Sequence, residues 1–290
     1  MSEILRGAPA AAALTESLTA RCDQLRERGL TPTLAVIRVG ARDDDLAYEK
    51  AAVRRCEQIG IEVRRFLLPE DCSSEMLLNT IDTVNIDGSI HGCLMFRPLK
   101  NRAAEAAACD RLSPEKDVDG MTLASLTHVF SGSDGGFPPC TAEACVRLLD
   151  HYGIGLDGKR VVILGRSLVI GKPIAMLMLS RNATVTMCHS HTSNIKEITR
   201  PADIIVACMG KAESIDSSYL SEGQIVLDVG IHERADGSLC GDVRTESIAS
   251  VVAAYAPSPG GIGSMTTSVL AAHVVEACEK IACNPMGSVV

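Results

Sequence analysis

Short apolar runs alternate with longer segments of helical periodicity along this chain. Such alternation predicts βαβ units and a mostly parallel sheet, that is, an α/β fold. In the N-terminal half the pattern predicts strands at 32–40, 61–68 and 92–96. It also predicts helices at 73–85 and at 43–59, the latter ended by Gly60, because glycine readily takes the left-handed conformation that closes a helix.

A stretch rich in Gly, Ser and Pro, SGSDGGFPPC at 131–140, interrupts this alternation. Because such clusters mark loops, we place the domain boundary directly after it and expect Thr141 to cap the next helix. The sequence then predicts two domains, residues 1–141 with a C-terminal helix at about 267–290, and residues 142–266. Within 142–266 it predicts helices at 142–152 and 171–181 and strands at 160–164, 184–188, 203–207 and 225–229.

Composition narrows the range of functions. The formal net charge of −8 argues against a surface for nucleic acid or anionic membranes, which needs a basic face. No apolar run is long enough for a membrane span, and the N-terminus lacks the pattern of a signal peptide. The twelve cysteines form no C-x-x-C pair, so we expect reduced, buried thiols of a cytoplasmic protein and no metal site.

The segment KRVVILGRSLVIGKPIA at 159–175 is typical of a buried strand, a glycine turn and a helix start. Gly165 ends the strand, and Gly171 and Pro173 open the helix, where backbone amides can hold a pyrophosphate. The spacing G-x-x-x-x-x-G is not the G-x-G-x-x-G of dinucleotide sites, so a plain βα turn remains an alternative.

The end of the next predicted strand bears on cofactor choice. NAD enzymes usually carry Asp or Glu there, to bind the ribose, whereas this chain has His189, Ser190 and His191 after Cys188. Arg166 in the preceding turn and a hydroxyl at this strand end suit a 2′-phosphate, which favours NADP over NAD. A solvated loop charge is the alternative for Arg166. Two further glycine clusters, VLDVGI (226–231) and APSPGGIGSMT (256–266), suggest backbone that approaches a ligand closely.

Taken together, the chain resembles the methylenetetrahydrofolate dehydrogenase/cyclohydrolase family over nearly its whole length. The resemblance rests on the order and spacing of six motifs: PEKDVDG (114–120), PPCT (138–141), GRSLVIGKP (165–173), DVGI (228–231), GDV (241–243) and PGGIGSMT (259–266). It implies an N-terminal folate-binding catalytic domain that faces a Rossmann-type NADP domain across a cleft. It also implies a homodimer formed through the NADP domains, with tetrahydrofolate one-carbon derivatives as substrates.

The resemblance also implies roles for particular residues. Tyr48 matches a tyrosine that stacks on the aminobenzoyl ring of the folate, and Asp119 matches a carboxylate that binds the pterin. Both are therefore expected in the catalytic site. The segment Pro259, Gly260, Gly261, Ile262 and Gly263 matches the loop that closes on substrate. The matched cofactor contacts are Gly165, Arg166, Ser167, Gly171, Ser190 and Ile231.

Three positions depart from the family pattern S-x-x-Y-x-x-x-K and its V-Q-L-P-L-P turn. Asp45 stands for the serine, Ala52 for the lysine and Phe96 for the glutamine, and the lysine and glutamine are associated with hydrolysis. Successive helix residues turn by about 100°, so position 52 lies about 40° from Tyr48 and Lys50 about 200° away. Lys50 is therefore expected to be a solvated surface charge, not a displaced catalytic lysine.

The leading interpretation is an NADP-dependent dehydrogenase acting on a folate one-carbon unit, with weak or absent cyclohydrolase activity. Alternatives are a bifunctional enzyme in which another residue, such as Asp45, Arg97 or Lys100, replaces the lysine, and a folate- or nucleotide-binding protein that has lost catalysis. An NADP enzyme for another small substrate is a further alternative, against which Tyr48 and Asp119 argue.

Overall fold

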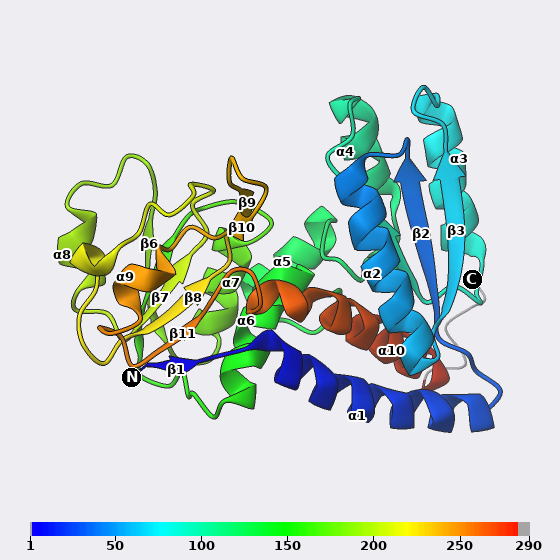
Figure 1. Ribbon diagram of the computed structural model, residues 1–290. Coiled ribbons are helices and arrows are strands. Elements are labelled where there is room, and N and C mark those ends of the chain that lie inside the picture. Colours follow the sequence, from blue (N-terminus) through cyan, green and yellow to red (C-terminus); the bar gives the residue numbers. More distant parts are fainter. Residues whose placement is uncertain (1, 284–290) are drawn as a thin grey trace. The chain divides into compact units, whose positions relative to one another are not determined.

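The computed structural model describes residues 2–283, and the chain divides into two compact units (Figure 1). Unit 1 comprises the residues up to Ala12 together with Thr141–Thr266. Unit 2 comprises Ala13–Cys140 together with the C-terminal segment from Thr267. The division differs from the predicted bounds at the N-terminus, because β1 (Glu3–Ile4) pairs with β11 (Ala254–Ala256) as an edge strand of unit 1.

Unit 2 is built on a three-stranded parallel sheet of order β3-β2-β4, formed by Glu62–Leu68, Thr33–Val39 and Gly92–Met95. Helix α2 (Asp43–Ile59) lies in front of this sheet in Figure 1, and α3 (Ser74–Ile86) lies behind it. Gly60 closes α2 at φ 94°, as the sequence predicts. Leu77 and Ile81 of α3 and Ala104 and Ala108 of α4 (Arg102–Arg111) join the buried cluster on the rear face.

The segment that carries the PEKDVDG motif is fixed to the end of α3. Lys116, in the 3-10 helix Pro114–Lys116, is buried, and its Nζ donates to the carbonyls of Val84, Asn85 and Asp87 at 2.6, 2.9 and 2.8 Å. A cation suits this place, because the last carbonyls of a helix lack intrahelical partners and carry partial negative charge. Just beyond Lys116, Asp117 forms a parallel bridge with Cys93 of β4, so the motif lies along the sheet.

Unit 1 contains a six-stranded parallel sheet of order β1-β11-β8-β7-β5-β6. Helix α7 (Gly171–Leu179) contacts β5 and β6 on one side, whereas side chains of α8 (Ile195–Thr199) and α9 (Thr245–Ile248) pack against the buried cluster of the sheet. The central strands are largely apolar because they are buried on both faces. They are β5 (Arg160–Leu164), β7 (Ile204–Ala207) and β8 (Ile225–Asp228). Strand β6 (Thr184–Cys188) lies at the edge of the sheet next to β5, and most of its residues are at least partly exposed.

Several elements differ from the sequence expectations or were not among them. Helix α6 (Cys140–His151) begins at Cys140, so Thr141 lies inside its first turn and cannot be its N-cap. Helix α10 (Thr266–Cys283) begins one residue before the predicted helix at about 267–290, and positions 284–290 of that prediction lie outside the described residues. It packs with unit 2, where Arg21 of α1 (Gly7–Glu27) binds Glu279. The unpredicted elements are α1 (Gly7–Glu27), α4, α5 (Leu123–Ser131), α8, α9, β1, β9 (His232–Glu233), β10 (Leu239–Cys240), β11 and the 3-10 helices Pro114–Lys116, Ser217–Tyr219 and Ile262–Ser264.

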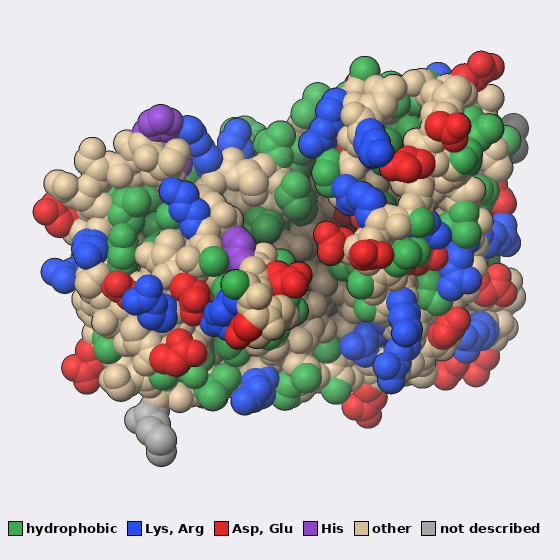
Figure 2. Space-filling view, turned by 45° about the horizontal axis from the view of Figure 1, so that its top comes forward, with side chains coloured by type: hydrophobic (Ala, Val, Ile, Leu, Met, Phe, Trp, Pro, Cys, Tyr) green, Lys and Arg blue, Asp and Glu red, His purple; other side chains and the backbone are tan. Residues whose placement is uncertain are grey.

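Within residues 2–283 no helix is both long and apolar enough to cross a membrane. The same part of the chain contains no group of three His, Cys, Asp or Glu side chains that could hold a metal ion. The cysteines are free thiols, most of them buried. Figure 2 shows basic and acidic side chains interspersed over the visible face, with no large area of one sign.

Candidate active site

A cavity of about 220 Å³ opens in unit 1 where the carboxyl ends of β6, β5 and β7 lie side by side. The chain leaves β5 to one side, through α7 to β6, and later returns on the other side of β5 as β7. Ligands of open α/β sheets bind at such a switch point. The residues that line the cavity are Leu164, Gly165, Arg166, Ser167, Cys188, His189, Ser190, Ile195, Cys208, Met209 and Lys211.

The glycines of the β5–α7 turn are required by close packing. A Cβ on Gly165, which has φ 138°, would lie 2.3 Å from the Cys208 carbonyl oxygen, and one on Gly171 would lie 2.5 Å from that of Gly165. The Ser167 hydroxyl accepts from the N–H groups of Ile170 and Gly171 at 3.1 and 3.3 Å. The Gly171 amide, at the helix start expected to hold a pyrophosphate, is thus bonded to Ser167, whose side chain lines the cavity.

The polar lining of the cavity fits an anionic nucleotide. Arg166 and Ser190 are exposed and both lie on its wall, with His189 between the strand end and Ser190. Lys211, which the sequence analysis did not single out, adds a second cation from the turn after β7. Cys208 is also on the wall, but burial raises the pKa of its thiol to about 12, so it is not a nucleophile at neutral pH. The guanidinium of Arg166, the ammonium of Lys211 and the hydroxyl of Ser190 are groups that suit phosphate oxygens.

Gly171, Ile231 and the loop Pro259 to Gly263, all predicted ligand contacts of unit 1, lie outside this cavity lining. Ile231 follows β8 and is 64 % exposed, which is high for a large apolar side chain. In the loop Pro259 to Gly263, the Gly260 carbonyl accepts from the Gly7 N–H at 2.9 Å, and the Gly261 N–H donates to Pro257. The Ile262 side chain is only 1 % exposed, so any contact of this residue with a ligand falls to its backbone.

In unit 2 the departures from the family pattern gather around Tyr48. Tyr48 is half-buried on α2, and the Phe96 ring packs edge-on against it, with ring centroids 6.0 Å apart. Ala52 is fully buried one turn further along the helix, whereas Lys50 is exposed. The helical periodicity therefore predicted correctly that Lys50 points away from the face that Tyr48 and Ala52 share.

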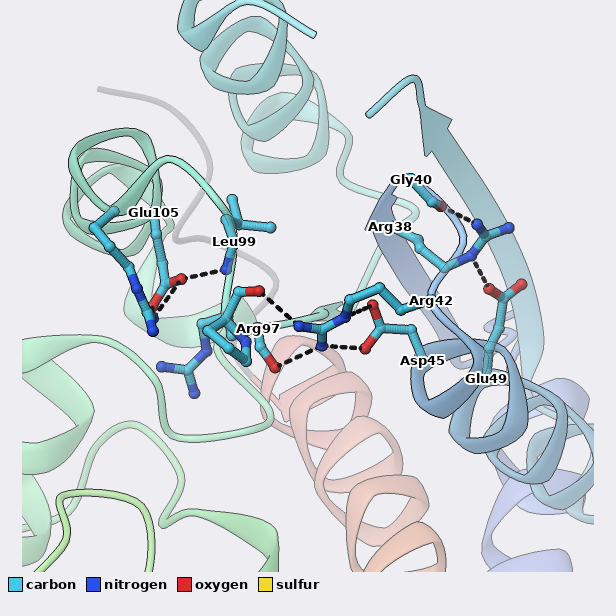
Figure 3. Close-up of polar contacts among 10 residues, drawn as sticks. Arg38, Gly40, Arg42, Asp45, Glu49, Arg97, Leu99 and Glu105 are labelled. Carbon is cyan, nitrogen blue, oxygen red and sulfur yellow. Dashed lines mark hydrogen bonds and ion pairs between the residues drawn. The ribbon is translucent and has the colours of Figure 1, made fainter. Parts of the chain in front are cut away.

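Asp45 is held by an arginine that the sequence analysis did not single out. Arg42 Nε and Nη2 donate to the two oxygens of the Asp45 carboxylate at 2.9 and 2.7 Å (Figure 3). The same guanidinium reaches the turn after β4, where it donates to the carbonyls of Pro98 and Arg97 at 3.0 and 3.4 Å. Asp45 is 6 % exposed, so both of its oxygens are occupied in a largely buried position.

Asp119 lies at the end of the PEKDVDG motif, beside a cluster that sequence reasoning missed. Burial raises the pKa of the Asp119 carboxyl, and the charge of Arg97 and the thiol of Cys140 oppose the shift. Cys140 Sγ is 3.7 Å from His273 Nδ1, which in turn donates to the Val118 carbonyl at 2.7 Å. His273 comes from α10, more than a hundred residues away in sequence, so no local pattern could have indicated it.

The structure thus has a cavity with a polar lining at a switch point in unit 1, and it places Tyr48 and Asp119 in unit 2. Two family descriptions match this arrangement. Residues 5–119 match the catalytic domain of tetrahydrofolate dehydrogenase/cyclohydrolase, and residues 139–282 match its NAD(P)-binding domain. The chain belongs to the tetrahydrofolate dehydrogenase/cyclohydrolase family. The predicted resemblance and fold class are therefore confirmed.

Relatives of this family are similar along almost the whole chain. The bifunctional protein FolD of Carboxydothermus hydrogenoformans is 46 % identical over 281 residues, covering 96 % of this chain and 98 % of that protein. FolD of Clostridioides difficile is 43 % identical over 277 residues, covering 96 % of each. The crystal structure of FolD, a methylenetetrahydrofolate dehydrogenase/cyclohydrolase, from Campylobacter jejuni is 34 % identical, with a TM-score of 0.94, and covers 97 % of this chain and 99 % of that one.

A solved relative contains the cofactor that the cavity suits. The FolD structure from Trypanosoma brucei, in complex with NADP and an inhibitor, is 29 % identical to this chain, with a TM-score of 0.90 and coverage of 97 % and 98 %. In the present chain, an NAD(P)-binding domain of the same family includes the lining of the cavity. Its polar side chains are those of Arg166, Ser167, His189, Ser190 and Lys211.

Proposed function

We propose that this protein oxidises 5,10-methylenetetrahydrofolate to the 5,10-methenyl cation with NADP, and that it hydrolyses this cation weakly or not at all. Membership of the family and the polar lining of the cavity support the first part. The second part rests on one observation, the replacement of a proton-transferring group on the Tyr48 face of α2 by the buried Ala52.

The oxidation makes few demands on protein acids and bases. The hydride leaves the methylene carbon with its electron pair, and the two flanking folate nitrogens stabilise the cation that remains. NADP, when bound, supplies the acceptor for this hydride. The protein has to hold the carbon in the right geometry, which carries much of the work in such reactions. We assign this positioning to Tyr48, as a surface for the aminobenzoyl ring, and to Asp119, as an acceptor for pterin N–H groups.

Hydrolysis has different requirements. Water adds to the cationic carbon, and the adduct then breaks a carbon–nitrogen bond, so protons must leave the oxygen and reach the nitrogen. A positioned acid or base typically contributes about 10²–10⁴-fold to such a step. Neither the methyl of Ala52 nor the ring of Phe96 can transfer a proton.

The other candidates for this role are poorly suited. The two oxygens of Asp45 are occupied by Arg42, and Lys50 is exposed on the opposite face. Lys100 pairs with Glu70 at 2.5 Å and is 81 % exposed. Arg97 is half-buried, but a guanidinium keeps its proton under all ordinary conditions and so stabilises charge without exchanging protons.

Two assays on the purified protein test the proposal. Addition of methylenetetrahydrofolate should reduce NADP, and the rate should fall when NADP is replaced by NAD. Methenyltetrahydrofolate supplied alone should disappear at no more than a few times its spontaneous rate. Binding of both ligands without NADP reduction would instead indicate a protein that has lost catalysis, and rapid enzymatic hydrolysis would indicate a bifunctional enzyme.

The proposal extends to the contacts and assembly implied by the family. We assign Gly165, Arg166, Ser167, Gly171, Ser190 and Ile231 to the cofactor, and the loop Pro259 to Gly263 to closure on the substrate. Support for the first set is that all but Gly171 and Ile231 line the cavity. We also propose a homodimer formed through the NADP domain, which size-exclusion chromatography with light scattering would test directly.

A further inference from the structure

A buried carboxylate lies directly behind the cofactor cavity. Asp242, in the GDV motif, is fully buried, and its carboxylate accepts from three consecutive backbone N–H groups of the turn after β7. Met209, Gly210 and Lys211 donate at 2.5, 3.2 and 2.8 Å. His232 Nε2 is a fourth partner of this carboxylate, at 2.8 Å.

The turn held in this way is part of the cavity wall. Met209 and Lys211 both line the cavity, as does Cys208 at the start of the turn. Hydrogen bonds from backbone N–H groups to an ionised carboxylate are stronger than those between neutral groups. One side chain therefore fixes the backbone from which two cavity-lining side chains project.

A second buried carboxylate, on Asp228, fixes the first. Asp228 ends β8 in the DVGI motif and accepts from the N–H groups of Asp242 and Val243 at 2.9 and 3.0 Å. The glycines of both motifs make this approach possible. A Cβ on Gly241 would lie 1.9 Å from Asp228 Oδ2, and one on Gly230 would lie 2.5 Å from the Asp242 carboxyl carbon.

We propose that Asp242 is a positioning residue for the cofactor, acting through the Met209–Lys211 turn, with Asp228 holding Asp242 in register. This inference rests on the proposed use of NADP. It assigns a common purpose to two separate motifs that are not themselves part of the cavity lining. Their carboxylates connect the ends of β7 and β8 behind the cavity, which explains why each motif pairs an aspartate with a neighbouring glycine.

The first test replaces Asp242 by Asn. The amide nitrogen of Asn is a donor and would face backbone N–H groups that the carboxylate now accepts, so the turn should lose its conformation. We expect Asp242→Asn to raise the dissociation constant of NADPH, followed by nucleotide fluorescence, about tenfold or more. The Michaelis constant for NADP should rise with it, whereas that for methylenetetrahydrofolate should change less than about twofold.

The matched control is Asp203→Asn. Asp203 also accepts from a backbone N–H, that of Arg160 at 2.7 Å, but it lies before β7, at the amino edge of the same sheet. This variant should lose thermal stability without losing NADPH affinity. If Asp242→Asn behaves in the same way, Asp242 is only a structural residue and the proposal is wrong.

A second variant tests the turn without disturbing a buried carboxylate. Gly210 has φ 69°, and a Cβ added at this position would have no heavy atom within 4 Å, so Gly210→Val strains only the backbone of the turn. Gly223, with φ 84° and similarly open surroundings, precedes β8 at the amino edge, and Gly223→Val is its control. We expect weaker NADPH binding from Gly210→Val alone; equal affinities in the two variants would overturn the proposal even if Asp242→Asn fails to fold.

Because NADPH binding requires no turnover, these tests are separable from the proposed activity. A wild-type protein that binds NADPH but does not oxidise methylenetetrahydrofolate would refute the activity and leave the role of Asp242 intact. Conversely, an active enzyme whose NADPH affinity is insensitive to both Asp242→Asn and Gly210→Val would refute the positioning role alone.

Discussion

At the residue scale, Ala52 is fully buried, so a lysine at this position would need space that the surrounding side chains now fill. Phe96 packs edge-on against Tyr48 on the same part of unit 2. Phe96 and Ala52 thus both adjoin Tyr48, Phe96 through a ring contact and Ala52 one helical turn further along α2. A change at either position alone should disturb this packing.

Restoring both polar residues should restore hydrolysis. We expect Ala52→Lys alone to destabilise the protein by about 1–3 kcal/mol through overpacking, and Ala52→Lys with Phe96→Gln to be less destabilised than the sum of the single changes. The double variant should accelerate methenyltetrahydrofolate hydrolysis about 10²-fold over the wild type. Lys50→Ala, on the exposed face of α2, is the control and should change neither quantity. A double variant that folds and binds folate but hydrolyses no faster would contradict the assignment.

Arg166 is the residue on which cofactor preference should depend. Its guanidinium can pair with a 2′-phosphate, and hydrogen bonds to charged groups contribute about 1.5–3 kcal/mol. Arg166→Ala should therefore lower kcat/KM for NADP about tenfold or more and kcat/KM for NAD only slightly. The ratio of the two kcat/KM values measures the effect. Arg181→Ala, which removes an exposed guanidinium paired with Asp150, should leave that ratio unchanged. An equal loss for NADP and NAD would exclude contact with the 2′-phosphate.

At the element scale, the sequence indicated those elements whose signals are local. Helix α2 has the predicted bounds because Gly60 supplies a left-handed C-cap, and β5 has its predicted end because its apolar run stops at Gly165. Strands β1 and β11 are only two and three residues long. They exist through pairing, β1 with β11 near the other end of the chain and β11 also with β8. No local pattern could have indicated them.

The distinction between local signals and long-range contacts also holds for the site residues. Tyr48, Asp45, Ala52 and Phe96 were located by motif and helical period, because all four depend on short-range spacing. The Arg42 contacts with the turn after β4 and the position of His273 beside Cys140 depend on tertiary structure, so the sequence contained no signal for them. Lys211 could have been identified from the sequence as a residue of the cavity. It follows the predicted strand at 203–207, and the carboxyl end of that strand lies beside the carboxyl end of β5.

The anchorage of the Asp119 segment to α3 can be tested at Lys116. Lys116→Met keeps most of the side-chain volume but removes three hydrogen bonds to carbonyls at the helix end. Leaving such groups unpaired costs about 1–3 kcal/mol, so the thermal midpoint should fall by several degrees. Affinity for a folate analogue should fall as well, because Asp119 is three residues away. Lys159 is an exposed lysine of unit 1, and Lys159→Met, the control, should alter neither the thermal midpoint nor the affinity for the folate analogue. A Lys116→Met protein with an unchanged thermal midpoint would show that the carbonyls find other partners.

At the scale of the whole molecule, the two units carry different parts of the chemistry. The cavity and the paired carboxylates Asp228 and Asp242 belong to unit 1, whereas Tyr48 and Asp119 belong to unit 2. The loop Pro259 to Gly263 is the one proposed folate contact within unit 1. Cofactor affinity and folate affinity should thus respond separately to substitutions in the two units, which is what makes the variants above informative.

The stability of the molecule should depend on pH through Asp228. Burial raises the pKa of this carboxyl to about 7, and the neighbouring Asp242 adds to the shift, against the opposing effect of backbone N–H groups. Between the ordinary aspartate pKa of about 3.9 and this value, the folded state binds the proton more tightly than the unfolded state does. The free energy of unfolding should therefore decrease as pH rises through this window, by up to about 1.4 kcal/mol per pH unit, and level off above it.

Asp228→Asn removes this titration and isolates its contribution. The variant should be less stable than the wild type at every pH, because its amide opposes a backbone N–H, but the difference should narrow as pH rises from about 5 to about 7. Asp203→Asn is the control, because the pKa of Asp203 is shifted in the opposite direction from that of Asp228. The Arg160 backbone N–H lowers the pKa of Asp203, so its stabilising effect is lost only in stronger acid and the offset from wild type stays constant in this window. Denaturant melts at closely spaced pH values would decide between the two patterns, and a constant offset for Asp228→Asn would mean that Asp228 is ionised throughout and held only by its N–H partners.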